Sequence, residues 1–230
     1  MKIQKFITLI ALSLGIYHTP VMAQVTNDLD QATNDEIAES ARMEVGLFTD
    51  KLSSIVVPKQ SPKNRRLLKE GALNLFIGRG EKYKTFVYDT LNVSIIDTIY
   101  NEAVKMQTTT LRDTTIRKNT PMARYLDTLV YKANARKYIK VTIRTTDWRD
   151  MRVSQIRKLA DGKYVIDVYF DQWYKTEWEG ENGTKTRLLY RDKTTKRVEC
   201  YIDISDTIKG KRVIIRLGDI FAEETTSYSS

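Results

Sequence analysis

The sequence predicts an α+β fold in which three N-terminal helices pack on a curved, cone-shaped antiparallel sheet of about five to six strands. Two observations lead to this prediction. Apolar residues recur at helical spacing in the first half of the chain, and in the second half they alternate with polar residues at a period of two. Because the predicted helices are amphipathic, each is expected to cover one face of the sheet.

The first 23 residues have the pattern of a secretion signal. Lys2 and Lys5 precede an apolar run, residues 6–16, that is too short to span a bilayer. Val21-Met22-Ala23 then supplies the small residues that a signal peptidase requires, which predicts cleavage before Gln24. No later run is apolar over about eighteen residues, so we expect a periplasmic or extracellular protein with no transmembrane segment after cleavage. An uncleaved anchor helix is the alternative.

The residue counts exclude several kinds of chemistry. His18, the only histidine, lies inside the predicted signal, and Cys200 is the only cysteine. Ser-His-Asp and Cys-His groupings, intrachain disulfides and the usual zinc, copper and haem ligand sets are therefore ruled out for the mature chain. We expect neither a metal nor another cofactor. Cys200 falls on the apolar side of an alternating strand, which predicts a small buried hydrophobic residue.

The chain carries a net charge of +9 at pH 7. Such an excess favours anionic partners such as a membrane surface or acidic glycans, although a solvated basic surface is the commoner explanation. The positive residues are scattered, and Lys63, Arg65 and Arg66 form the tightest cluster. Because no long basic run is present, we do not expect a nucleic acid partner.

The first predicted helix follows a flexible polar tail, residues 24–32. Thr33-Asn34-Asp35-Glu36 has the pattern of a capping box, in which the threonine and glutamate side chains serve the first free amides. The helix should run for about four turns and stop before Pro58. Its expected buried residues are Ile37, Ala41, Val45, Phe48 and Leu52.

Two further helix starts carry proline. Ser61-Pro62 predicts a second helix, with proline where its missing amide costs nothing, and Gly78 and Gly80 should end it. Thr120-Pro121 predicts the third helix. Residues 85–119 between these two helices are read as an insertion that adds a hairpin.

The second half of the chain predicts strands. Arg152–Ala160 should pair with Lys163–Lys175 around the turn at Asp161-Gly162. Asn182-Gly183 marks the next reversal, and residues 184–192, 197–204 and 211–217 complete a meander of about five strands, the last two joined around Lys209-Gly210. Residues 33–226 are expected to form a single domain.

This order of elements resembles the nuclear transport factor 2-like superfamily, also described as SnoaL-like or cystatin-like cones. The resemblance covers roughly Ala32 to Thr225. It depends on the element order, on the third helix running directly into a long hairpin, and on the closing Leu217-Gly218-Asp219-Ile220-Phe221-Ala222-Glu223-Glu224-Thr225, which is similar to that of exported Bacteroidota proteins of this fold. A cystatin-like or lipocalin-like sheet is the alternative.

The resemblance implies an open mouth lined by the concave sheet face, and it also implies sheet-to-sheet homodimers. Tyr169 and Trp173 share one face of a strand and are candidates for gripping a ligand there, although packing is the commoner role of such rings. For an enzyme, Asp167 or Asp171 with Tyr169 would move the proton. The alternative is a solvated carboxylate facing Lys or Arg across the sheet.

Asp-Thr followed by an aliphatic residue or threonine recurs along the chain. The pattern resembles the O-glycosylation acceptor of secreted Bacteroidota proteins, and Thr114 is the best placed because its surroundings are polar. Asp-Thr pairs also suit turns and helix ends, which is the alternative explanation. The candidate acceptors are Thr90, Thr98, Thr114, Thr128 and Thr207.

These observations favour an exported, non-catalytic binding or interaction module of the bacterial cell envelope. Its expected partner is an unknown small molecule, a glycan or an envelope protein, and a homodimer is expected from the resemblance. One alternative is a cofactor-free isomerase, hydratase or cyclase that uses a carboxylate and a tyrosine. Another is a structural component of an envelope or conjugation assembly.

Overall fold

The computed structural model describes residues 29–89, 91, 94–111, 115–135, 139–159, 162–180, 186–207 and 210–227. Three α-helices and ten strands lie in these ranges. The elements in chain order are α1 (Gln31–Ile55), α2 (Pro62–Leu73), the 3₁₀ helix η1 (Ile77–Gly80), β1 (Tyr83–Tyr88), β2 (Ile95–Asn101), β3 (Lys105–Leu111), β4 (Thr115–Pro121), α3 (Met122–Ala135), β5 (Ile139–Thr145), the 3₁₀ helix η2 (Trp148–Asp150), β6 (Arg152–Val153), β7 (Arg157–Lys158), β8 (Tyr164–Glu179), β9 (Thr186–Thr207) and β10 (Gly210–Thr226).

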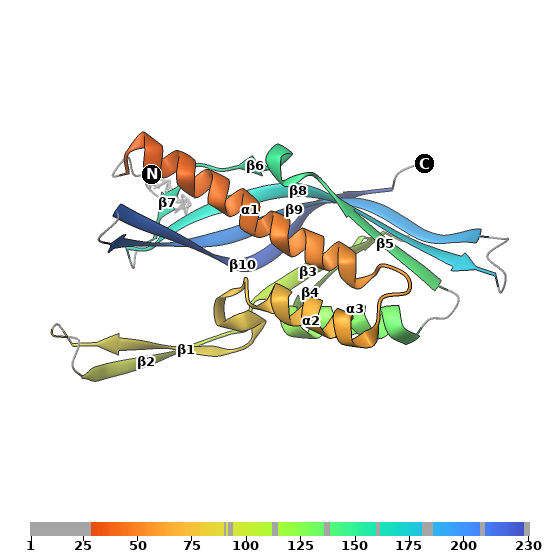
Figure 1. Ribbon diagram of the computed structural model, residues 1–230, viewed down its shortest axis with the longest axis horizontal. Helices are drawn as coiled ribbons and strands as arrows, with labels where there is room; N and C mark the ends of the chain where they lie inside the picture. Colours follow the sequence, from red (N-terminus) through yellow and green to blue (C-terminus); the bar gives the residue numbers. More distant parts are fainter. Residues whose placement is uncertain are drawn as a thin grey trace, which may run out of the picture.

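Eight strands form one mixed sheet. Its main path runs β4-β3-β10-β9-β8-β5, and the short β6 and β7 also pair with β8. Every pairing in this sheet is antiparallel except that of β3 with β10, which is parallel through Met106 and Ile220. β1 and β2 pair with each other in a separate two-stranded sheet that projects from the body (Figure 1).

The predicted fold class was therefore wrong in its architecture. The structure is mostly β: the sheet has eight strands rather than five or six, it is mixed rather than antiparallel, and four strands precede α3. The error has a local cause in residues 85–119, which were read as an insertion with one added hairpin. They contribute to two hairpins, and the second of these joins the main sheet through β3.

α1 crosses one face of the sheet obliquely, over β8, β9 and β10 (Figure 1). Its residues spaced by three and four are buried and form the central part of the core with the inward side chains of the strands. Phe48 of α1 meets Phe76 edge to face, with ring centroids 5.1 Å apart. The helix is longer than the expected four turns, and it is capped by Asp30, whose side chain accepts from the Thr33 amide, rather than by Thr33.

α2 begins as predicted, with Ser61 as the N-cap and Pro62 in the first turn. Arg65 of this helix is buried and ties three segments together. Its guanidinium donates to the carbonyls of Ile55 and Val57 at 2.8 and 2.9 Å, which serves the end of α1, and to the side chain of Asn134 on α3 at 2.8 Å.

β8 and β9 are long strands of 16 and 22 residues that run side by side. Residues 186–192 and 197–204, which were predicted to belong to two separate strands, are parts of β9, which is continuous, and residues 184 and 185 lie outside the described residues. Because side chains alternate along a strand, every second residue faces the helices. On β9 these inward residues change from apolar to polar: Val198, Cys200 and Ile202 belong to the core, whereas Asp192, Thr194 and Lys196 line a cavity. The polar inward residues of β9 form part of the candidate functional site.

Candidate functional site

The four residues expected to line the mouth lie on the opposite face of the sheet. Ile166, Val168 and Phe170 of β8 belong to the core beneath α1, so the alternating residues Asp167, Tyr169, Asp171 and Trp173 point away from the helices. Their direct partners on β9 are Glu199, Arg197, Thr195 and Lys193.

Asp167 is buried on this outer face by ion pairs. Arg157 approaches one of its oxygens at 2.7 Å and Arg197 the other at 3.4 Å, while Arg197 also bonds Glu223 at 2.6 Å. Two guanidinium groups therefore occupy both oxygens of this carboxylate in charge-assisted hydrogen bonds, which is the arrangement of a structural ion pair. Asp167 therefore matches the alternative to a catalytic role, a strand carboxylate that faces arginine across the sheet.

Asp171, Tyr169 and Trp173 also have partners on the outer face. Lys193 lies 2.8 Å from Asp171 and also stacks on the Trp173 ring, and Arg152 stacks on Tyr169. Burial raises the pKa of Asp171, but hydrogen bonds from Lys193 and Thr195 outweigh it, so the pKa is lowered overall. These groups form a paired, charged surface, and their proposed catalytic and binding roles stay predictions.

The candidate glycosylation sites fall in different settings. Thr98 lies on β2, and Thr128 is exposed on α3, where its hydroxyl donates to the Arg124 carbonyl at 2.9 Å. Thr207 is the last residue of β9, and its side chain is not described. Thr90 and Thr114 lie outside the described residues.

A cavity of about 900 Å³ lies between α3 and the polar half of the inward sheet face. We call it the α3 cavity. β3, β4, α3, β8 and β9 all contribute to its wall, so segments far apart in the sequence meet there. Lys118, Arg124 and Lys132 bring positive charge to the lining, and Asp192 is the one carboxylate among the described residues that line it.

Asp192 is 5 % exposed and lies among tyrosines in the α3 cavity. Thr194 donates to its carboxylate at 3.3 Å, and the Tyr190 hydroxyl also donates to it. Burial raises the pKa of Asp192, and these hydrogen bonds together with the Lys196 ammonium offset only part of the rise. The Tyr190 hydroxyl in turn accepts from the Leu111 amide at 3.1 Å, and burial raises its pKa to about 12.

Lys196 is 3 % exposed and reaches the α3 cavity beside Asp192. Its ammonium donates to the Gln107 carbonyl at 2.6 Å, and within the described part of the chain no carboxylate lies within 4.0 Å of it. Burial lowers the pKa of Lys196 from 10.5 to about 8, and Asp192 opposes this shift. The lysine is therefore still protonated at pH 7, as a buried cation served by one carbonyl.

Gln172 completes this polar cluster. Its side chain is 6 % exposed, it lies directly opposite Thr194 across the sheet, and its Oε1 has no hydrogen-bond partner among the described residues. A buried amide oxygen without a donor costs free energy, so the position favours a ligand that brings a hydroxyl or amine. The α3 cavity thus offers a cation for an anionic group and an acceptor for a donor.

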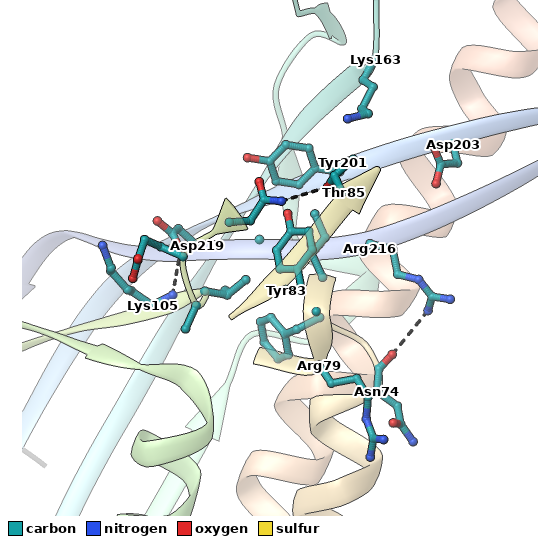
Figure 2. A pocket seen from close by; sticks show the side chains of 18 of the residues that line it. Asn74, Arg79, Tyr83, Thr85, Lys105, Lys163, Tyr201, Asp203, Arg216 and Asp219 are labelled. Atoms are coloured by element: carbon teal, nitrogen blue, oxygen red, sulfur yellow. Dashed lines mark hydrogen bonds between the residues drawn. The ribbon is translucent and has the colours of Figure 1, made fainter. Parts of the chain in front are cut away.

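A second hollow of about 930 Å³ lies where β1 and β2 leave the body, and Figure 2 shows its lining. Several of its polar groups are already paired. The amide of Lys105 donates to Asp219 at 2.7 Å, and Arg216 donates to the Asn74 carbonyl at 3.4 Å. We favour the α3 cavity as the candidate site because it contains the buried groups that lack a partner.

Within the described ranges, no group of three or more metal-ligating side chains is close enough to hold an ion. None of the described helices combines the length and the apolar content that a membrane span requires.

Sequence reasoning missed Asp192, Lys196, Gln172 and Tyr190, although a signal was present. Along both β8 and β9 the inward residues change from apolar to polar without a break in alternation. If each of these segments is recognised as one long strand, the change from apolar to polar inward residues marks the end of the core. No protein-family model, curated protein or solved structure matches this chain, so the family resemblance stays a prediction.

Proposed function

We propose that the chain is a non-catalytic binding module that takes a small acidic, hydroxyl-bearing molecule, such as an acidic sugar, in the α3 cavity. The observation that supports this most directly is Lys196, a buried cation with one carbonyl as its hydrogen-bond acceptor. Asp192 is near Lys196 but not within ion-pair distance, so an anionic ligand group would supply a direct partner for the ammonium, and a ligand hydroxyl would donate to the Gln172 side-chain oxygen.

The charge of the wall supports the same ligand class. Lys118, Arg124 and Lys132 add to Lys196, and Asp192 opposes them. Burial raises the pKa of Asp192, and hydrogen bonds from Thr194 and Tyr190 already occupy its carboxylate within the wall. The tyrosines of the wall offer apolar ring faces and hydroxyls, which suit a sugar ring.

The experiment compares glucuronate and galacturonate with their neutral parents, glucose and galactose. The melting temperature of the wild-type chain should rise with the acids and not with the neutral sugars, because a ligand that binds only the folded state stabilises it. Lys196→Met should lose the shift. Lys193→Met, on the outer face of the same strand, should keep it. A shift that is equal for acids and neutral sugars, or that survives in Lys196→Met, contradicts the proposal.

The second candidate function is a cofactor-free isomerase, hydratase or cyclase. The observation that favours it is the hydrogen bond between Tyr190 and Asp192, a carboxyl group whose pKa is raised inside a cavity. If the chain is such an enzyme, Asp192→Asn should abolish turnover of a bound acid while leaving its binding in place. Product formation monitored by NMR would distinguish the two functions.

The proposed compartment is the periplasm or the cell exterior, and the support for it is the signal pattern in residues 1–23, which lie outside the described residues. A bacterial envelope protein, a glycan and a second copy of the chain are the proposed larger partners. The alternative role in an envelope or conjugation assembly is favoured by the exposed β1–β2 sheet.

A further inference from the structure

The two-stranded sheet of β1 and β2, residues 83–101, is an exposed apolar projection that we call the arm (Figure 1). Two-stranded sheets are only marginally stable in water unless they pack on something. The large apolar side chains of the arm are between 45 % and 78 % exposed. They are Phe86, Tyr88, Leu91, Ile95, Ile96, Ile99 and Tyr100.

The exposed apolar area of the arm is large enough for a protein interface. Each of these side chains exposes roughly 100 Å², which gives on the order of 700 Å² in total. The largest apolar patch of an ordinary monomer is about 300–600 Å², and a standard interface buries about 800 Å² on each partner. Four of these side chains, Ile95, Ile96, Ile99 and Tyr100, lie on β2, so about 400 Å² of the exposed apolar area adjoins the edge that can pair, and the backbone hydrogen bonds of a new strand pairing add to that contact.

The charge distribution favours a second copy of the chain as the partner. Within residues 83–101 the charged side chains are Lys84, Asp89 and Asp97, whereas the whole chain carries +9. Two basic bodies repel each other, so the nearly neutral arm is where two copies approach most easily. An anionic lipid surface, in contrast, would attract the body rather than the arm.

The free edge of β2 fits a symmetric pairing. The segment Ile95–Asn101 contains neither lysine nor proline, the residues that usually protect a sheet edge. If two copies of β2 pair antiparallel about Thr98, Ile96 lies opposite the partner's Tyr100. Asp97 then lies opposite the partner's Ile99, so no like charges face each other.

The base of the arm is held firmly. Gly78 has a φ of 58°, and a Cβ there would lie 2.4 Å from the Tyr83 ring, so only glycine lets this ring pack against the turn. Across the strands, Asn101 donates to Thr85 at 2.9 Å. A fixed base places the arm before a partner arrives, which lowers the entropy cost of association.

We propose that the arm is a homodimerisation element in which β2 pairs antiparallel with β2 of a second copy, forming a continuous four-stranded sheet. The contact is isologous, because the same strand is used by both copies, and it therefore closes as a two-fold dimer. It does not depend on what the α3 cavity binds.

Sedimentation velocity tests the association. The chain, expressed with its own N-terminal segment and with its N terminus identified by intact mass, should be a dimer at about 100 µM, because a contact of this size belongs to the smaller and weaker interfaces. Ile96→Lys should be a monomer with an unchanged melting temperature. Leu67→Lys, at a 62 % exposed apolar position on α2, is the matched control and should remain a dimer.

Disulfide cross-linking tests the register. Thr98→Cys places one accessible thiol at the symmetry centre, because Cys200 is fully buried. Facing Cα atoms in an antiparallel pair lie about 4.5–5.5 Å apart, within disulfide range. Thr98→Cys should form an intermolecular disulfide much faster than Thr128→Cys on α3. A monomeric wild-type chain, equal cross-linking of the two variants, or a monomer that binds phosphatidylcholine–phosphatidylglycerol vesicles through the arm would overturn the proposal.

Discussion

Replacing Lys196 with methionine should stabilise the ligand-free protein. The pKa of Lys196 is lowered from 10.5 to about 8 by burial, and each pKa unit corresponds to about 1.4 kcal/mol, so keeping the lysine charged at pH 7 costs about 3 kcal/mol. Lys196→Met removes this cost, but it leaves the Gln107 carbonyl without its donor, which costs about 1–2 kcal/mol.

The expected net effect is a gain of about 1–2 kcal/mol at pH 7, with a rise in melting temperature of about 2–4 °C per kcal/mol for a chain of this size. The pH dependence has a definite sign. The folded wild-type chain binds this proton more weakly than the unfolded chain, so its stability rises with pH between about 8 and 10.5. The advantage of Lys196→Met should therefore be largest below pH 8 and should shrink above it.

Urea unfolding at pH 7 and at pH 10, followed by circular dichroism, measures both effects. Lys193→Met is the control, since Lys193 lies on the same strand but on the outer face, paired with Asp171. Its effect should be small, because an ion pair near the surface contributes little to stability. If Lys196→Met is destabilising at pH 7, or if its effect is the same at both pH values, Lys196 is an ordinary structural residue and the argument for an anionic ligand is refuted.

Four further predictions concern other parts of the molecule. Arg65→Ala should lower the free energy of unfolding by about 3 kcal/mol, because it leaves two carbonyls at the end of α1 unserved; a loss below about 1 kcal/mol in urea unfolding would contradict this role. Asp171→Asn should reduce the loss of stability on acidification below about pH 4. The pKa of Asp171 is lowered in the folded chain, so its ionised carboxylate stabilises the fold above that range, and this stabilisation disappears as the carboxylate is protonated. Unchanged acid unfolding curves would count against the prediction. Gly78→Ala should loosen the base of the arm, because its φ is 58° and the Tyr83 ring occupies the Cβ position; faster amide exchange in β1 is the expected sign, and wild-type protection there would disprove it. Intact mass of the exported protein tests cleavage before Gln24 and sugar on the Asp-Thr threonines, and Thr98 should be unmodified in the dimer.

The sequence alone determined features that depend on near neighbours in the chain. The start of α2 at Ser61-Pro62, the buried stripe of α1 and the burial of Cys200 were all predicted and are confirmed. The hairpin of β7 and β8 also follows from a local signal, since Gly162 has a φ of 85° in the turn. Capping, helical periodicity and turn geometry involve residues a few positions apart, so the sequence displays them directly.

Tertiary structure decided which face of each strand turns inward and which strands meet. Alternation placed Tyr169 and Trp173 on one face of their strand, but only the packing of α1 and α3 made the opposite face, which Asp192 shares, the inner one. The parallel pairing of β3 with β10 joins residues more than a hundred positions apart. Such contacts depend on the total apolar area that the whole chain buries, and no local pattern records that quantity.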